Sequence, residues 1–513
     1  MYLFLAIIIL LLSGYWFRQA AGTISIYKPN MMSWIYYYEF ILLTLIGAVL
    51  VVYQVDHHYM INKLTDENSR VIGFYAILYT LVFFPLGMKL ANFLFHEKRV
   101  DLLFERYTTS PIQYEKKYND YNIRLLLLLL SGISVFSVIY VLYMLGDIPL
   151  LRFFRPSEFF NFAEFRIEAS KNFQGNEYIR NLFALSLTPI LSYVAYGYKL
   201  RDKTLFSRIW FYVMLLFTVL ILTYNFEKAP ILFYLLGFVF YQVYWKGSIS
   251  KKMIVISFLG LLVLIVAMYT ILMLGNNIDF TVLFNYNSGI LGRLLLSQGA
   301  GTFLSFDIFP DIHPYIGFSS VSEFISNVFD LEYSEKSSRV IMEQINPNGV
   351  KMGLAGVVNS LFIAEAWANF GICGVIVAPL YVGFLIQSLY LFFLKSKKTP
   401  FLLALFVSFS IKGSITGGFN SYFYNINLFF LLFVFLGVYG LALVWFLGCS
   451  RTDNYILSQE DKAEPNYISV DEALRMIQDK YKNAYLDYQF TFDYISNFYE
   501  KESYLGYFVR DIA

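Results

Sequence analysis

The chain has 513 residues, of which 58% are hydrophobic, 20% aromatic and only 15% charged, with a mean hydropathy of +0.55. Ordinary globular chains are about 45–50% apolar and about 25% charged, so this composition excludes a soluble enzyme, a disordered tail protein and a disulfide scaffold. The net charge of +2 supplies no basic surface for nucleic acid. The two cysteines, Cys373 and Cys449, form no zinc-binding pattern with histidine, so neither a nucleic-acid partner nor a metal is expected.

Eleven apolar runs are expected to form membrane helices, because about 20 apolar residues in a helix cross about 30 Å of hydrocarbon. They lie near residues 2–17, 33–54, 71–94, 124–145, 179–198, 208–224, 229–245, 253–274, 371–394, 400–416 and 425–448. The first run has no basic segment before it and no cleavage site after it, so we expect a retained helix.

Lys and Arg gather in alternate short loops, at 98–124, 199–208, 246–252 and 395–398. Under the positive-inside rule these loops are cytoplasmic. The N-terminus is then outside and the C-terminus inside the cell. Two long segments, about 146–178 and 275–355, are expected on the extracytoplasmic side.

Two further segments, 288–306 and 356–370, mix apolar residues with charged and polar ones. The basic loops before and after them are both cytoplasmic, so either both segments cross the bilayer or both only dip into it. The sequence thus predicts an all-α polytopic membrane protein with about 11 transmembrane helices, or up to 13 if both segments cross.

The composition changes at Cys449. We therefore expect a multi-pass membrane domain, 1–448, followed by a short cytoplasmic tail, 449–513. In the tail, Asn454 and Pro465 indicate a loop, and Ser469 with Glu472 has the spacing of a capping box at the start of an amphipathic helix.

Four charged residues stand in or beside apolar segments, where a charge at the bilayer centre costs about 2.5–3.5 kcal/mol. They are Lys228 in NFEKAP, Arg293 in GILGRLLLSQG, Glu365 in FIAEAWANFG and Lys412 in SFSIKGSITGG. A cation or carboxylate in such a place indicates a substrate site. The alternative is that each side chain reaches the headgroups or forms a buried structural pair.

The first long segment places Arg152, Arg155 and Arg166 among several phenylalanines. This pattern is typical of a helix lying on the membrane surface. The sharper interpretation is that the guanidinium groups bind a diphosphate, whose oxygens match their paired donors.

His313 follows the Arg293 segment, and Asp307 and Asp311 lie near it in sequence. A histidine beside a phosphoryl leaving group can donate a proton, with an aspartate as orienting partner or base. A turn around neighbouring prolines explains the same residues. His57 and His58 are expected to be simple surface residues.

Glu365 and Asn369 are four residues apart and share a helix face. Glu365 could activate a sugar hydroxyl as general base, Asn359 and Asn369 could bind sugar oxygens, and Trp367 could stack on a pyranose ring. The alternative is a polar seam between packed helices.

Several stretches, in this order along the chain, resemble the Wzy-type oligosaccharide repeat-unit polymerases of bacterial surface polysaccharides. They are FFRPSEFFNFAEFRIEA, NFEKAP, GRLLLSQGAGTFLSFDIFPDIHPYIG, NSLFIAEAWANFGICGVIV and SFSIKGS, within residues 124–448. The resemblance implies an enzyme of the bacterial cytoplasmic membrane that joins lipid-linked oligosaccharides by inverting glycosyl transfer. Undecaprenyl diphosphate would leave, and no metal, nucleotide or other cofactor would be needed.

The resemblance further implies that Arg166, Arg293, Gln298 and His313 handle the diphosphates. Lys228 and Lys412 stand at positions where the resemblance implies arginine more often than lysine. The implied partners are undecaprenyl-diphosphate-linked oligosaccharide and membrane lipid, and candidate protein partners are a flippase and a chain-length regulator. We expect Arg293, His313 and Glu365 to be catalytic.

Two rival functions fit the same residues. Intramembrane Lys412 and Glu365 also suit a flippase or another transporter of lipid-linked oligosaccharide. A polysaccharide ligase would share the reaction and differ only in its acceptor. A membrane protein with a purely structural role is a further alternative.

Overall fold

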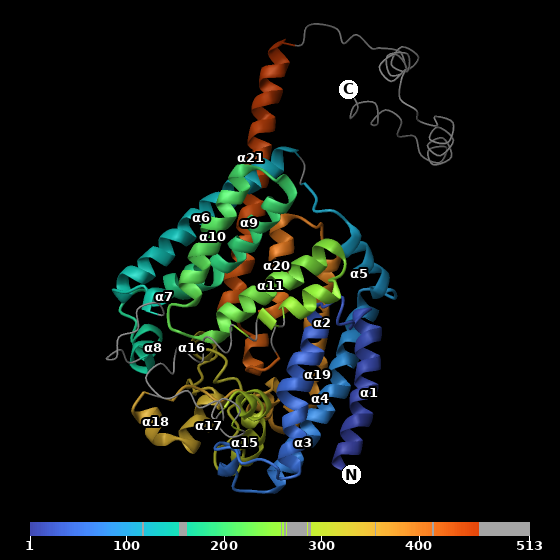
Figure 1. The fold of residues 1–513 in the computed structure, drawn as a ribbon, viewed down its shortest axis with the longest axis vertical. Coiled ribbons are helices and arrows are strands. Elements are labelled where there is room, and N and C mark those ends of the chain that lie inside the picture. Colours follow the sequence, from blue (N-terminus) through green and yellow to red (C-terminus); the bar gives the residue numbers. More distant parts are fainter. Residues whose placement is uncertain are drawn as a thin grey trace. The chain divides into compact units, whose positions relative to one another are not determined.

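The computed structural model describes residues 1–114, 117–152, 162–257, 259–260, 263, 285, 289–353, 355–412 and 415–460. This part of the chain is built from helices and irregular connections and contains no β-strand (Figure 1). The expected all-α class is therefore confirmed. The chain divides into two units, Met1–Phe446 and Leu447–Ala513.

Seven helical segments among the described residues are long and apolar enough to cross a membrane. They are Tyr2–Ala21 (α1), Met31–Val52 (α2, η1 and α3), Asn68–Leu94 (α4), Asp120–Leu145 (in α6, Lys117–Leu145), Leu205–Leu222 (α10), Phe362–Lys395 (α19) and Phe419–Val444 (η5, Phe419–Tyr422, and part of α21, Ile426–Glu460). The chain is a multi-pass helical membrane protein.

The other apolar runs also coincide with helices, with one exception. The run at 179–198 forms η3 (Ile179–Leu187) and α9 (Thr188–Asp202), and the runs at 229–245 and 400–416 form α11 (Lys228–Lys246) and α20 (Pro400–Lys412). The run at 253–274 lies largely outside the described residues. The expected tail helix after Ser469 also lies outside them. The loop expected at Asn454 is wrong, because α21 continues as helix to Glu460.

The two long segments between spans fold into short helices. These are α7 (Pro149–Arg152), α8 (Phe162–Ser170), α14 (Ile290–Gly292), η4 (Arg293–Ser297), α15 (Ala300–Ile308), α16 (Glu323–Val328), α17 (Ser337–Ile345) and α18 (Pro347–Lys351). Lys171 Nζ, just after α8, donates to the carbonyl oxygens of Gly353 and Ala355. The two segments therefore touch, as expected of loops on the same side of a membrane.

The basic loops also contact one another. Arg201 Nη1 lies 2.7 Å from an oxygen of Asp120, and Arg124 pairs with Asp202 at 3.2 Å. Beside α5 (Val100–Thr109), Lys398 Nζ donates to three carbonyl oxygens at the end of that helix. Loops that the charge pattern assigned to one side of the bilayer thus lie together.

Helices α4 and α19 cross at two glycines. A Cβ on Gly87 would overlap Leu380 O, and a Cβ on Gly383 would overlap Phe84 O. Without a hydrophobic driving force between helices in lipid, such small residues allow the close backbone contact that stabilises the pair. Phe17 of α1 stacks on Phe84 at 5.5 Å and extends this packing.

Within the described residues, wide π-helical turns occur in three places: η1 (Ile35–Leu45), η3 and η4. The first lies between α2 (Met31–Trp34) and α3 (Ile46–Val52). In a π-helix a side-chain hydroxyl can take the place of a lost backbone bond. Thr44 Oγ1 donates to Glu39 O at 2.8 Å, and Thr188 Oγ1 donates to Phe183 O at 3.2 Å, each five residues back. Such turns are frequent at functional sites.

The two partial segments become short helices joined to longer structure. The first forms α14, η4 and α15, and the second is extended to Leu361 and then enters α19. Helix α19 is interrupted at Gly371, whose φ of 58° suits glycine because it has no Cβ. Neither partial segment forms a span of its own.

The close contact between α4 and α19 predicts that adding a methyl group at Gly87 destabilises the protein. Gly87→Ala places a methyl group on Leu380 O, so the helices must separate, and overpacking of this kind costs about 1–3 kcal/mol. Gly132→Ala is the matched control, because nothing lies within 4 Å of its added Cβ. Thermal unfolding of both purified variants in detergent should show a lowered midpoint for Gly87→Ala only.

Candidate functional site

Three cations from separate parts of the chain, in α8, at the start of α11 and at the start of η4, lie near enough for the charges of two of them to act on the third. Lys228 begins α11, outside the seven candidate spans, and burial lowers its pKa to about 8, helped by the positive charges of Arg293 and Arg166. Arg293 begins η4. Burial raises the pKa of Tyr59, and the positive charge of Arg293 lowers it by a smaller amount, so Arg293 also lies near Tyr59. This cationic cluster is defined as Arg166, Lys228 and Arg293.

The turn that carries Arg293 is fixed from two directions. A Cβ on Gly47 of α3 would lie on Leu295 O, so the two backbones are in direct contact. His58 Nε2 lies 2.9 Å from Ser297 Oγ. The interpretation of His58 as a surface residue is wrong: it is fully buried, and burial lowers its pKa to about 4, so it is neutral at pH 7.

Gln298 and Asn359 come from the two partial segments and bind each other. Asn359 Nδ2 donates to Gln298 Oε1 at 3.0 Å. The backbone supports the pair, because Gly301 N donates to Asn359 O at 3.2 Å. Two residues expected to bind substrate therefore lie side by side.

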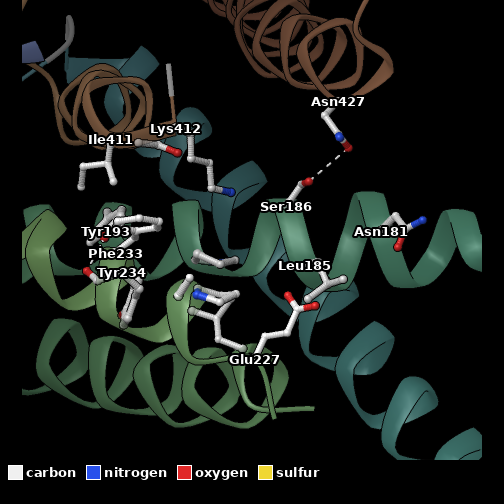
Figure 2. A pocket seen from close by; sticks show the side chains of 15 residues that line it. Asn181, Leu185, Ser186, Tyr193, Glu227, Phe233, Tyr234, Ile411, Lys412 and Asn427 are labelled. Carbon is white, nitrogen blue, oxygen red and sulfur yellow. Dashed lines mark hydrogen bonds between the residues drawn. The ribbon is translucent and has the colours of Figure 1, made fainter. Parts of the chain in front are cut away.

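A cavity of about 470 Å³ lies between η3, α9, α11, α20 and the start of α21 (Figure 2). Its volume falls in the range of about 300–1,000 Å³ that is usual for small-ligand sites. Lys412 reaches into it from α20, and Glu227, the residue before α11, faces it from the opposite side (Figure 2). The other polar residues in its wall are Asn181, Ser186, Tyr193, Tyr234, Ser408 and Asn427.

Glu227 links the cavity to the cationic cluster. Arg166 Nη2 donates to Glu227 Oε1 at 3.0 Å, and Lys228 is the next residue in the chain. The cavity wall is therefore joined through Glu227 to Arg166 by an ion pair and to Lys228 by the chain.

Glu365 and Asn369 do not line the cavity. Glu365 is 3% exposed, and its Oε2 accepts the N–H of Asn420 at 2.7 Å. Asn369 Nδ2 donates to Asn420 Oδ1 at 2.8 Å. These are the contacts of a polar seam, which was the alternative interpretation of this helix face.

Buried Glu39 of η1 acts in the same way, because its Oε2 accepts the N–H groups of Ile415 and Thr416.

Trp367, His313 and Asp307 have protein partners. Trp367 Nε1 donates to Phe309 O at 3.0 Å. His313 Nδ1 lies 2.8 Å from Pro314 O, in the turn that was the alternative to a catalytic role. The oxygens of Asp307 accept the N–H groups of Thr65 and Asp66 and so anchor the start of α4 rather than orient His313.

The first long segment contributes Arg166 to the cluster. Arg152 ends α7, and Arg155 lies outside the described residues. The described part of the chain holds no group of three His, Cys, Asp or Glu residues that could bind a metal ion.

Of the polar residues of the cavity wall, the sequence interpretation named only Lys412; it missed Glu227, Asn181, Ser186, Tyr193, Tyr234, Ser408 and Asn427. Glu227 could have been found, because it stands beside Lys228 in NFEKAP. Asn181 and Asn427 have no distinctive pattern, because each lies singly at the end of an apolar run.

No family model matches this chain, and neither a curated protein nor a solved structure matches it.

The cationic cluster predicts how Lys228 titrates. Removing a neighbouring positive charge favours the protonated amine, so Arg293→Gln and Arg166→Gln should each move the pKa of Lys228 upward from about 8. The pH dependence of amine labelling at Lys228, followed by mass spectrometry, measures this shift. Arg339→Gln, which alters an arginine outside the cluster, should leave the midpoint unchanged. Identical midpoints in the wild type and both cluster variants would contradict the cluster.

Proposed function

We propose that this protein is a Wzy-type polymerase of a bacterial cytoplasmic membrane, joining undecaprenyl-diphosphate-linked oligosaccharide repeat units into a surface polysaccharide. The observation that carries the proposal is the cationic cluster, Arg166, Lys228 and Arg293, beside a cavity in the helical domain. The order of the resembling stretches supports it independently, since three of them supply one cluster residue each.

The cluster suits a diphosphate leaving group. When the bond between the sugar and the diphosphate breaks, negative charge develops on the leaving oxygen and positive charge on the sugar ring. Cations already held in place stabilise the leaving group without reorganisation, and such electrostatic stabilisation commonly contributes most to the rate enhancement of an enzyme. Gln298, which follows η4, and its partner Asn359 would bind sugar or phosphate oxygens.

In this proposal the segments 146–178 and 275–355 face the outside of the cell, and the basic loops face the cytoplasm. Transfer is direct and inverting and uses neither metal nor nucleotide. A flippase that delivers the lipid-linked unit and a regulator of chain length are the expected protein partners.

The proposal predicts a defined in vitro product. Purified protein in lipid vesicles, given lipid-linked units that accumulate in cells lacking this chain, should form a ladder of longer saccharides in the presence of EDTA. Arg293→Ala should reduce ladder formation by at least about 100-fold, as expected for one lost transition-state contact. Arg99→Ala, in a basic loop on the other side, should have little effect.

Cells provide the test against transport. Deletion of a polymerase leaves single lipid-linked units on the outer face of the membrane, whereas deletion of a flippase leaves them on the inner face. Units on the inner face, or wild-type chain lengths with Arg293→Ala, would contradict the proposal.

A further inference from the structure

Glu227 uses one carboxylate oxygen in a hydrogen bond with the protein and has a second oxygen that can accept from a ligand. Its Oε1 accepts from Arg166 at 3.0 Å, and no donor in the described part of the chain reaches Oε2. The side chain is 38% exposed and lies in the wall of the cavity (Figure 2). The guanidinium orients the carboxylate, while Oε2 keeps its capacity to accept a hydrogen bond.

Lys412 stands on the opposite wall. No described residue forms an ion pair or hydrogen bond with its ammonium, although the surrounding lining includes Leu185, Phe233 and Ile411. An ammonium among apolar side chains gains most from a ligand with oxygen atoms. The cavity therefore offers a hydrogen-bond acceptor on one side and a donor on the other, which suits a hydroxyl-rich ligand.

Three of the remaining polar side chains of the wall, Ser186, Asn427 and Asn181, have hydrogen-bond partners that orient them. Ser186 Oγ donates to Asn427 Oδ1 at 3.2 Å, and Asn181 Oδ1 accepts from Arg180 Nε at 3.0 Å. Because both amide oxygens are occupied, each Asn is oriented with its amide nitrogen available. A few placed polar groups in a largely apolar wall are typical of a specific ligand site.

We infer that this cavity is the acceptor-sugar site and that Glu227 takes the proton from the attacking hydroxyl. The inference rests on the proposed glycosyl transfer and adds to it the base and the position of the acceptor. Lys412 holds an oxygen of the same sugar, so that the hydroxyl points from the cavity toward the cationic cluster.

The step is balanced. The acceptor oxygen forms a bond to the anomeric carbon of the donor, and the bond from that carbon to the diphosphate oxygen breaks. The electron pair of the broken bond leaves with the diphosphate, held by the cluster. The hydroxyl proton passes to Glu227 Oε2 and from there to water.

Glu365 is less suited to this role. Its carboxylate is enclosed, with Oε2 bound to Asn420 N, and a Cβ on Gly418 would lie 2.5 Å from that oxygen. A sugar hydroxyl would have to displace a backbone contact to reach it. Glu227 needs no such rearrangement.

The test compares Glu227→Gln with Glu343→Gln in the vesicle assay. Glu343 is a matched control, because it also pairs with an arginine, Arg339, at 3.2 Å and lies outside the cavity. Loss of a general base should slow ladder formation by about 100-fold or more in Glu227→Gln, with binding of the lipid-linked donor retained. Glu343→Gln should keep the wild-type rate. Formate should restore activity to Glu227→Ala, because a small carboxylate can occupy the space and accept the proton.

Lys412→Gln separates binding from chemistry. A lost charged hydrogen bond of about 1.5–3 kcal/mol corresponds to a rise of roughly tenfold or more in the KM for the acceptor, with kcat changed less. A rate within about threefold of wild type for Glu227→Gln, or a slow Glu227→Ala that formate does not restore, would overturn the assignment of Glu227.

Failure of the proposed function gives a different result. If the wild type forms no ladder, the polymerase proposal fails. The saccharide site in the cavity is then tested separately, by measuring how tightly the protein binds the oligosaccharide that mild acid releases from the lipid-linked units. Binding by the wild type that weakens about tenfold in Lys412→Gln supports a saccharide site. No binding, or equal binding by both proteins, overturns it.

Discussion

The structure depends on supplying partners for polar groups inside a largely apolar protein, where an unsatisfied backbone group or charge costs several kcal/mol. The buried connection between α20 and α21 shows how this is done: Glu39 accepts the N–H groups of Ile415 and Thr416, and Glu365 accepts that of Asn420. Two carboxylates, of which Glu365 was expected to be catalytic, thus complete the hydrogen bonding of this connection and of η5 within it. These contacts with the backbone distinguish both carboxylates from Glu227, which lies in the wall of a cavity.

Positive charge is used in two ways in this chain. Lys398 and Arg201 bind carbonyls or carboxylates at the ends of helices, in loops that the sequence assigns to the cytoplasmic side. In the cationic cluster, by contrast, the charges lie close enough to lower the pKa of Lys228. Glu227 already offsets part of their mutual repulsion through its pair with Arg166, and an anion that binds between the cations would relieve the rest. That relief is the physical basis of the proposal that a diphosphate binds there.

Much of the fold could be predicted from the sequence, because the apolar runs and the loop charges act locally. The cluster members Arg166, Lys228 and Arg293 could be singled out as well, since each charge stands in or beside an apolar segment. The expectation that His58 lies on the surface was wrong, because His58 belongs to a short polar loop yet is buried against Ser297. Glu365 and Asn369 both bind Asn420, which agrees with the alternative of a polar seam. Single-sequence patterns carry no information on such distant partners.

The sequence by itself determined that this is a multi-pass helical membrane protein with charged residues where lipid would exclude them, because hydropathy and charge distribution directly reflect transfer into hydrocarbon. Only the tertiary structure decided which of those charges serve the backbone and which face a cavity. That decision depends on contacts between segments far apart in the chain, such as Arg166 with Glu227, and on wide π-helical turns whose stabilising threonines have no distinctive pattern. Proximity in space, and not residue type, separates a structural charge from a candidate site.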